Sequence, residues 1–351
     1  MNQQFVQIAD EIELESGRVL LEPTLSYRVF GNMLVNESTP VIWVCHALTA
    51  NDDPFDWWPG LFGENDLFNP DDYTIICVNM IGSCYGSVGP LSVNPETGEP
   101  YFHDFPSVTV KDNAKAFSKL ADKLGIDQID MLIGASLGGQ VALQWAVLEP
   151  ERFRSATFIA TSSEHSPWGI AFNHSQRLAI EADPTWGLPN EESGIEGMKV
   201  ARGIALLSYR NYQSYGTSQS RSSDDDFFSY TAHSYQEYQG EKLAKRFNAI
   251  SYHRLSQTMD SHDISRDFGS VEEALARLEM PVLNISMEED ILFPPSEQIR
   301  IARGVKNGEH VTIPTEKGHD GFLIETEKLS RLLDEFTSKN IIQKESLNLK
   351  A

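Results

Sequence analysis

The stretch Met131-Leu132-Ile133-Gly134-Ala135-Ser136-Leu137-Gly138-Gly139 decides the fold of this 351-residue chain. An apolar run ends here in the pattern Gly-x-Ser-x-Gly, and residues 140–147 continue it with the pattern of a helix. Small residues on both sides of the serine allow a sharp turn from strand to helix, and the helix start supplies free N–H groups. The stretch therefore predicts that Ser136 is a nucleophile presented in a cleft. The alternative is an ordinary loop, because Gly and Ser are common in loops.

Strand and helix patterns alternate around this stretch up to about residue 160. The solid apolar runs at 40–45 and 73–79 predict strands that are covered on both faces. Helical spacing at 112–124 leads into the strand before Ser136, and another apolar run follows at 156–160. Residues 5–30 alternate polar and apolar side chains, as in an antiparallel hairpin or edge strands. This rhythm predicts an α/β fold with a mostly parallel central sheet and helices on both faces.

The rhythm stops between residues 168 and 278, where we expect no buried strand. Helical patterns occupy residues 172–182, 194–209, 235–247 and 252–260. They are separated by Pro184, Pro189 and a polar, serine-rich loop at residues 214–226. These helices could be one more layer of the sheet or an insertion above its edge.

The α/β rhythm resumes after residue 278, which favours an insertion. Strands are predicted at 281–286 and 310–314 and a closing helix at 322–336, with a frayed tail after residue 338. We therefore predict a core domain, made of residues 1–167 and 279–351. The inserted helical lid domain would span residues 168–278.

Composition limits the partners and the compartment. The formal net charge of −23 disfavours nucleic acid and anionic membranes, because phosphate binding needs a basic face. The three cysteines, Cys45, Cys77 and Cys84, have neither disulfide nor metal spacing and suit a reducing compartment. We find no signal-peptide pattern at the N-terminus and no apolar run long enough for a bilayer. These features predict a soluble cytoplasmic protein without a metal site.

A serine nucleophile needs a base, and the base needs a carboxylate that fixes its tautomer. In a doubly wound sheet, such groups lie on loops after the carboxyl ends of strands. Of the nine histidines, His319 lies on the loop after the last predicted strand. The acid should follow the strand that ends near residue 286, where Glu288, Glu289 and Asp290 are all candidates. The order serine, acid, histidine is that of the α/β-hydrolase fold.

An oxyanion hole would combine the N–H of Leu137 with an N–H from the loop at 46–50, where we expect Leu48 to be the donor. Removing such a donor typically costs about 3 kcal/mol in the activation barrier. The turn at residues 82–86, Gly-Ser-Cys-Tyr-Gly, also follows a strand and could present Cys84 as a nucleophile. Turn-forming residues rather than a helix follow it, so we interpret it as a loop that lines the site.

From about residue 15 to residue 335, the chain resembles the homoserine O-acetyltransferases, a family of α/β-hydrolase acyltransferases. The matching stretches are His46-Ala47-Leu48-Thr49, Trp57-Trp58, Gly82-Ser83-Cys84-Tyr85-Gly86-Ser87, Asn94-Pro95-x-Thr97-Gly98, Asp104-Phe105-Pro106, His165-Ser166-Pro167-Trp168, Tyr235 with Gln239-Gly240, Asp290-Ile291-Leu292-Phe293-Pro294-Pro295, and Gly318-His319-Asp320-Gly321-Phe322-Leu323. Together they are far more specific than the serine turn alone.

The resemblance implies a catalytic role for Asp290 and a ping-pong reaction. Ser136 would take an acetyl group from acetyl-CoA, which is a substrate and not a bound cofactor. The hydroxyl of L-homoserine would then receive it, forming O-acetyl-L-homoserine for methionine biosynthesis. Arg202 and Tyr209 would help to hold the amino acid from one helix face, two turns apart, and Asp320 would hold its ammonium. The resemblance also implies a homodimer formed through the helical lid.

Some positions depart from the family pattern, and other functions remain open. Leu137 replaces a common methionine, Val88 stands where a hydroxyl residue is frequent, and residues 246–250 replace a form that carries an aspartate. These departures concern substrate choice. A succinyl donor or a serine acceptor would use the same catalytic residues, whereas a carboxylesterase would use water. A non-catalytic binding module would have no use for all three groups of the triad.

Overall fold

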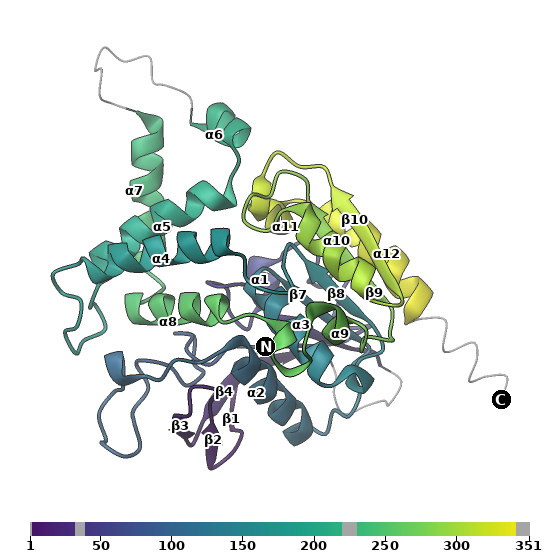
Figure 1. Ribbon diagram of the computed structural model, residues 1–351, viewed down its shortest axis with the longest axis horizontal. Helices are drawn as coiled ribbons and strands as arrows, with labels where there is room; N and C mark the ends of the chain where they lie inside the picture. The colour runs from purple at the N-terminus through teal and green to yellow at the C-terminus, as the bar shows by residue number, and fades with distance from the viewer. Residues whose placement is uncertain (1, 32–38, 220–229, 342–351) are drawn as a thin grey trace.

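The computed structural model describes residues 2–31, 39–219 and 230–341 (Figure 1). Within these ranges, eight strands form a central sheet in the order β1-β4-β6-β5-β7-β8-β9-β10. Their bounds are β1 (Gln4–Gln7), β4 (Thr24–Phe30), β5 (Val41–Cys45), β6 (Thr74–Val78), β7 (Met131–Ala135), β8 (Ala156–Ile159), β9 (Val282–Met287) and β10 (Gly308–Ile313). From β6 to β10 all neighbours are parallel, while β4 pairs antiparallel with β1 and β6. The prediction of a mostly parallel sheet is confirmed.

A small antiparallel hairpin, β2 (Glu11–Glu13) and β3 (Val19–Leu21), stands beside the sheet, as the alternation in residues 5–30 predicted. The core lies on both faces of the sheet, because successive side chains of a strand point to opposite sides. On β5, Trp43 packs with α2 (Val110–Lys123) and α3 (Leu137–Leu148), whereas Ile42 packs on the other face, with α12 (Thr326–Asn340). Helices therefore cover both faces.

The turn between β7 and α3 has the strained shape that a nucleophile elbow requires. Ser136 adopts φ 55° and ψ −127°, a backbone conformation that is rare for residues other than glycine. A Cβ atom on Gly134 would lie 2.3 Å from the Gly138 carbonyl oxygen. A Cβ atom on Gly138 would lie 2.1 Å from the Cys45 carbonyl oxygen, on the neighbouring strand. Glycine at both positions is thus what lets the serine turn sit against β5.

We expect the substitution Gly138→Ala to lower the free energy of unfolding by about 3 kcal/mol, because its Cβ meets backbone that cannot rotate away. Urea denaturation followed by tryptophan fluorescence measures this change. Gly216→Ala is the matched control, because nothing lies within 4 Å of its Cβ position in a surface helix. Equal destabilisation by the two substitutions would contradict the packing argument.

Helices fill the space between β8 and β9 in the sequence, as predicted. They are α4 (Pro167–Glu181), α5 (Ile195–Tyr209), α6 (Tyr212–Ser218), α7 (Thr231–Ala244) and α8 (Ala249–Asp260). Figure 1 shows α4 to α7 grouped on one side of the molecule, away from α10 (Pro295–Gly304) and α12. We call α4 to α8 the lid. The short elements η3 (Ile264–Asp267) and α9 (Val271–Leu275), inside the predicted lid range, pack instead against α3 and α10.

Two local predictions are wrong. Residues 214–218 belong to α6 and not to a loop, because the Asn211 side chain caps the helix by accepting from the Ser214 N–H. The remainder of the predicted loop, residues 220–226, lies outside the described residues. The closing helix is also broken at Glu325, which separates α11 (Gly321–Ile324) from α12. The predicted frayed tail falls mostly outside the described residues.

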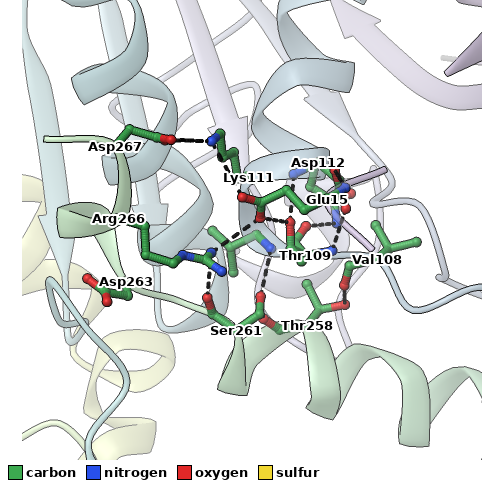
Figure 2. Close-up of polar contacts among 12 residues, drawn as sticks. Glu15, Val108, Thr109, Lys111, Asp112, Thr258, Ser261, Asp263, Arg266 and Asp267 are labelled. Carbon is green, nitrogen blue, oxygen red and sulfur yellow. Dashed lines mark hydrogen bonds and ion pairs between the residues drawn. The ribbon is translucent and has the colours of Figure 1, made fainter. Parts of the chain in front are cut away.

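The end of the lid is tied to the core by a polar cluster (Figure 2). The Thr258 hydroxyl on α8 donates to the Val108 carbonyl oxygen at 2.7 Å, just before α2 begins. Lys111 on α2 forms ion pairs with Asp267 at 2.6 Å and with Glu15 at 3.4 Å. These contacts join the chain after the lid to the start of α2 and to the N-terminal hairpin.

The described residues contain no helix that is both long and apolar enough to pass through a membrane. Within the same ranges, no group of three or more His, Cys, Asp or Glu side chains is arranged to hold a metal ion.

Candidate active site

The structure brings Ser136, His319 and Asp290 into one hydrogen-bonded chain. The Ser136 hydroxyl lies 2.9 Å from His319 Nε2, and His319 Nδ1 lies 2.7 Å from Asp290 Oδ2. Because an ionised carboxylate only accepts, the Nδ1 proton is donated to Asp290 and Nε2 is left to accept from the serine. All three side chains are buried. The base is therefore held in the tautomer that can deprotonate Ser136.

Asp290 is the acid among the three candidates after β9. Its Oδ1 accepts hydrogen bonds from the N–H groups of Leu292 and Phe293, at 2.8 and 2.9 Å. Both carboxylate oxygens are thus engaged, which fixes the plane of the group against the imidazole. Glu288 and Glu289 are exposed and line a surface hollow, so they belong to a solvated acidic turn and do not reach the base.

Aromatic rings surround the base. His319 lies in η4 (Gly318–Asp320), after β10, with ring-centroid distances of 5.6 Å to Tyr209, 5.3 Å to Phe293 and 5.2 Å to Phe322. Tyr209 comes from the lid, while the other two rings come from the core. The lid thus reaches the catalytic base directly and removes water from one side of it.

The expected oxyanion hole lies between the start of α3 and the loop after β5. Leu137 is the first residue of α3, where N–H groups have no partner within the helix. In the other loop, the Ala47 carbonyl accepts from His46 Nδ1 at 2.8 Å and from the Ala50 N–H at 3.0 Å. The Ala47 carbonyl and the Leu48 N–H belong to the same trans peptide group and point in opposite directions. The Leu48 N–H therefore faces away from His46 Nδ1 and the Ala50 N–H. Leu48 is thereby restrained in one orientation.

His46 provides this restraint, and the sequence interpretation missed it. The Met80 N–H donates to His46 Nε2 at 3.0 Å, so the ring proton must be on Nδ1, facing Ala47. Burial lowers the pKa of His46 to about 4, which keeps the ring neutral at physiological pH. The sequence does mark this residue, because His46 is the first residue of His46-Ala47-Leu48-Thr49, the first stretch that matches the family.

We expect His46→Ala to reduce kcat/KM by roughly 10- to 100-fold, because it frees the Ala47–Leu48 peptide to rotate. Steady-state kinetics on the purified variant measures the loss. His310→Ala is a suitable control, because this partly buried histidine bonds Ser286 on β9 and lies away from the oxyanion loop. A His46→Ala variant as active as this control would show that the loop holds its shape without the histidine.

The three predicted acceptor residues gather beside the base. Arg202 lies over the Tyr209 ring, with 5.5 Å from Cζ to the centroid, and Tyr209 packs on His319. Asp320 directly follows His319 and forms an ion pair with Arg210, 2.8 Å from Nε to Oδ2. Sequence interpretation missed Arg210, although it directly follows Tyr209.

Cys84 is not a nucleophile elbow, as predicted. Residues 82–86 form bends and turns with no helix after them. The Cys84 Sγ lies 3.7 Å from the Arg246 carbonyl oxygen. Burial raises the pKa of this thiol to about 11, so it stays protonated at neutral pH.

Comparison with known proteins places this geometry in a family. The family model described as alpha/beta hydrolase fold matches residues 40–326. The homoserine O-acetyltransferase of Cyclobacterium marinum is 45% identical over 342 residues, covering 97% of this chain and 96% of that protein. The crystal structure of homoserine O-acetyltransferase from Bacillus anthracis superposes with a TM-score of 0.87 at 24% identity, covering 95% and 97% of the two chains.

A structure of an acetylester hydrolase from Corynebacterium glutamicum also superposes, with a TM-score of 0.82 at 20% identity, covering 97% of this chain and 95% of that one. At these low identities the two superpositions establish the fold alone. The sequence relationship over nearly the whole length is more specific, and it confirms the predicted resemblance. The chain belongs to the homoserine O-acetyltransferase family of the α/β-hydrolase fold.

Proposed function

We propose that this enzyme transfers an acetyl group from acetyl-CoA to the hydroxyl of L-homoserine, by a ping-pong mechanism through acetyl-Ser136. The observation that carries the proposal is the hydrogen-bonded Ser136–His319–Asp290 chain beneath a lid whose Tyr209 contacts the base. The names of the relatives support the acceptor and the acyl group.

In the first half-reaction, Ser136 Oγ attacks the thioester carbonyl while His319 Nε2 takes the hydroxyl proton. The N–H groups of Leu137 and Leu48 stabilise the oxyanion that forms. The C–S bond then breaks, and His319 gives its proton to the departing sulfur of coenzyme A. Acetyl-Ser136 remains, with Asp290 having stabilised the imidazolium in between. Acetyl-CoA acts as a substrate, and no resident cofactor takes part in this scheme.

In the second half-reaction, the homoserine hydroxyl takes the place of the serine. His319 removes its proton, the oxygen attacks the acetyl carbonyl, and the bond to Ser136 breaks as the serine recovers a proton from His319. Arg202 suits the carboxylate of the amino acid, and Asp320 suits its ammonium. Both groups lie beside the base, so they would position the hydroxyl of a bound amino acid for attack.

Hydrolysis is the main competing function, because an esterase would use the same catalytic triad. Water is roughly 55 M and an amino-acid acceptor about millimolar, so transfer needs a preference of roughly 10⁴- to 10⁵-fold, about 6 kcal/mol. The aromatic rings around His319 and the lid residues above it favour transfer, since they exclude water and orient an acceptor. A succinyl donor and a serine acceptor are tested in the same experiment.

The test incubates the pure enzyme with acetyl-CoA or succinyl-CoA, with and without L-homoserine or L-serine, and follows free thiol. We expect steady thiol release only with acetyl-CoA and homoserine together. Equally fast release without any acceptor would reject transfer in favour of hydrolysis. Faster release with succinyl-CoA, or with serine, would change the donor or the acceptor and leave the triad in place.

We also propose that two copies associate through the lid. Large apolar side chains are at least half exposed on its helices: Trp168, Leu178, Val200, Leu207, Tyr212 and Tyr238. Exposed apolar side chains that gather in one patch favour a protein partner over water, and the proposed dimer would cover these six. Light scattering on the pure protein should give twice the mass of the chain, and a monomer at micromolar concentration would reject the dimer.

We propose a cytoplasmic location for the enzyme. The three cysteines are free, which suits a reducing compartment.

A further inference from the structure

At the end of α5, the lid contacts the part of the core that carries the catalytic base. Arg210 follows the last residue of this helix in an extended conformation, with φ −114° and ψ 159°. A Cβ atom on Gly318 would lie 3.1 Å from the Tyr209 carbonyl oxygen and 3.2 Å from the Arg210 carbonyl carbon. The backbone at the end of α5 therefore lies directly against the loop that carries His319. Side chains from the two segments are held in a fixed relation to each other.

Arg210 and Asp320 form an ion pair across this contact. Arg210 Nε lies 2.8 Å from Asp320 Oδ2, and the two side chains are 25% and 14% exposed. The contact of the pair is to Oδ2, and a carboxylate can accept several hydrogen bonds at its two oxygens. The carboxylate can therefore bind a second cation while Arg210 remains in contact with it.

The charges around Asp320 come from three elements. Burial is the largest effect and raises the pKa of the Asp320 carboxyl. The positive charges of Arg210 and Arg202, from the lid, lower that pKa. In the core, His319 also lowers it and Asp290 raises it, while the phenols of Tyr209 and Tyr215 face it from α5 and α6. Arg210 is thus the cation in direct contact with a carboxyl that burial pushes toward its neutral form.

We infer that Arg210 is a positioning residue for the acceptor: its guanidinium, 2.8 Å from Asp320 Oδ2, attracts this carboxylate and holds it beside the base, so that the carboxylate can bind the ammonium of the incoming amino acid. This inference rests on the proposed function, because it assumes that the acceptor carries an ammonium group. A neutral carboxyl would attract that ammonium far less than a carboxylate does. Removing Arg210 should therefore weaken acceptor binding and leave the reaction with acetyl-CoA intact.

The opposite role would be competition, in which Arg210 occupies Asp320 until a substrate displaces it. The geometry favours the positioning role, because the backbone of Arg210 is fixed against Gly318 and keeps the guanidinium next to Asp320. The two roles predict opposite changes in KM for homoserine. Competition predicts a lower KM when Arg210 is removed, and positioning predicts a higher one.

The experiment compares the wild type with Arg210→Gln, which removes the charge, and Arg210→Lys, which keeps it. Lys199→Gln is the matched control, since it removes two other ion pairs of the lid, from Lys199 on α5 to Glu196 on α5 and to Glu241 on α7. Two quantities are measured from pH 6 to 8.5. One is the rate of the first thiol release from acetyl-CoA without acceptor, and the other is KM for homoserine.

We expect Arg210→Gln to raise KM for homoserine about tenfold at pH 8, roughly the effect of one charge-assisted contact on the position of the carboxylate. Removing Arg210 raises the pKa of Asp320 further, because its positive charge lowers that pKa in the wild type. Between the pKa of Asp320 in the variant and its lower pKa in the wild type, the ratio of the two KM values should increase as the pH falls, by up to about tenfold per unit, and it should level off below both. Taking the ratio to the wild type removes any pH effect that the two enzymes share. Arg210→Lys should restore most of the pH profile, and the first thiol release should stay within about twofold of wild type.

Asp320→Asn provides an independent check, because it imitates the neutral carboxyl at every pH. Its KM should be high and should not depend on Arg210, so the double variant should add little to either single one. An unchanged or lower KM in Arg210→Gln, or an equal loss in both half-reactions, would overturn the inference. The wild-type enzyme tests the proposed function independently of the variants. If homoserine does not accelerate thiol release from acetyl-CoA by the wild type, the proposed function is rejected, whatever the Arg210 variants show.

Discussion

Replacing Ser136 by alanine should reduce acetyl transfer by at least about 10⁴-fold, the scale observed when a triad nucleophile is removed. The variant has no Oγ to carry the acetyl group, and its base has no proton to take. Burial and backbone strain at this position change little, because alanine keeps the Cβ atom of serine. Thiol release from acetyl-CoA in the presence of homoserine measures the loss.

Ser155→Ala is the control for this experiment. Ser155 is also fully buried, but its hydroxyl donates to the Asp130 carbonyl at 2.7 Å, away from the triad. This variant should lose about 1 kcal/mol of stability and keep its activity within about twofold. A Ser136→Ala enzyme that retains turnover comparable to the Ser155→Ala control would mean that no acyl-serine lies on the reaction path.

The second large effect is expected for Asp290→Asn, about 10³- to 10⁴-fold in kcat. The oxygen that accepts from Leu292 and Phe293 must remain an oxygen, because an NH₂ group there would face two N–H donors. The new NH₂ group therefore faces His319 Nδ1 and donates to it. The imidazole proton then moves to Nε2, where the ring can no longer accept the proton of Ser136.

Glu289→Gln tests whether activity requires the carboxylate at position 290 or only a negative charge in this turn. Glu289 is one residue before Asp290 but is exposed, and it should keep its activity within about twofold. Protein stability should be followed in parallel by urea denaturation, so that a folding defect is recognised. A loss of less than tenfold in Asp290→Asn would show that the tautomer of His319 is fixed by another group.

Much of this site follows from local sequence patterns. The Gly-x-Ser-x-Gly turn between β7 and α3 combines an apolar run, two obligatory glycines and a helix start, all within a few residues. His319 could be predicted because the carboxyl ends of parallel strands meet at one edge of the sheet, although 183 positions separate it from Ser136. These predictions use rules of topology and do not depend on individual contacts.

The remaining parts depend on contacts that a pattern does not specify. Asp290 could not be separated from Glu288 and Glu289 by position, because what distinguishes it is the pair of N–H groups that orient it. Arg210 was missed for the same reason: its partner, Asp320, lies on a distant loop. Helix α6 was missed because a single side-chain cap, from Asn211, decides between helix and loop in a polar segment.

The proposed reaction depends on a covalent acetyl-enzyme that is discharged by an amino acid and not by water. The most direct measurement is intact-protein mass spectrometry after mixing with acetyl-CoA, followed by peptide mapping and then by addition of L-homoserine. We predict a gain of one acetyl group located on Ser136, which persists in buffer and disappears when homoserine is added. An enzyme that never gains the group while turning over, or that loses it equally fast in buffer alone, would rule out the acetyl-Ser136 transfer mechanism.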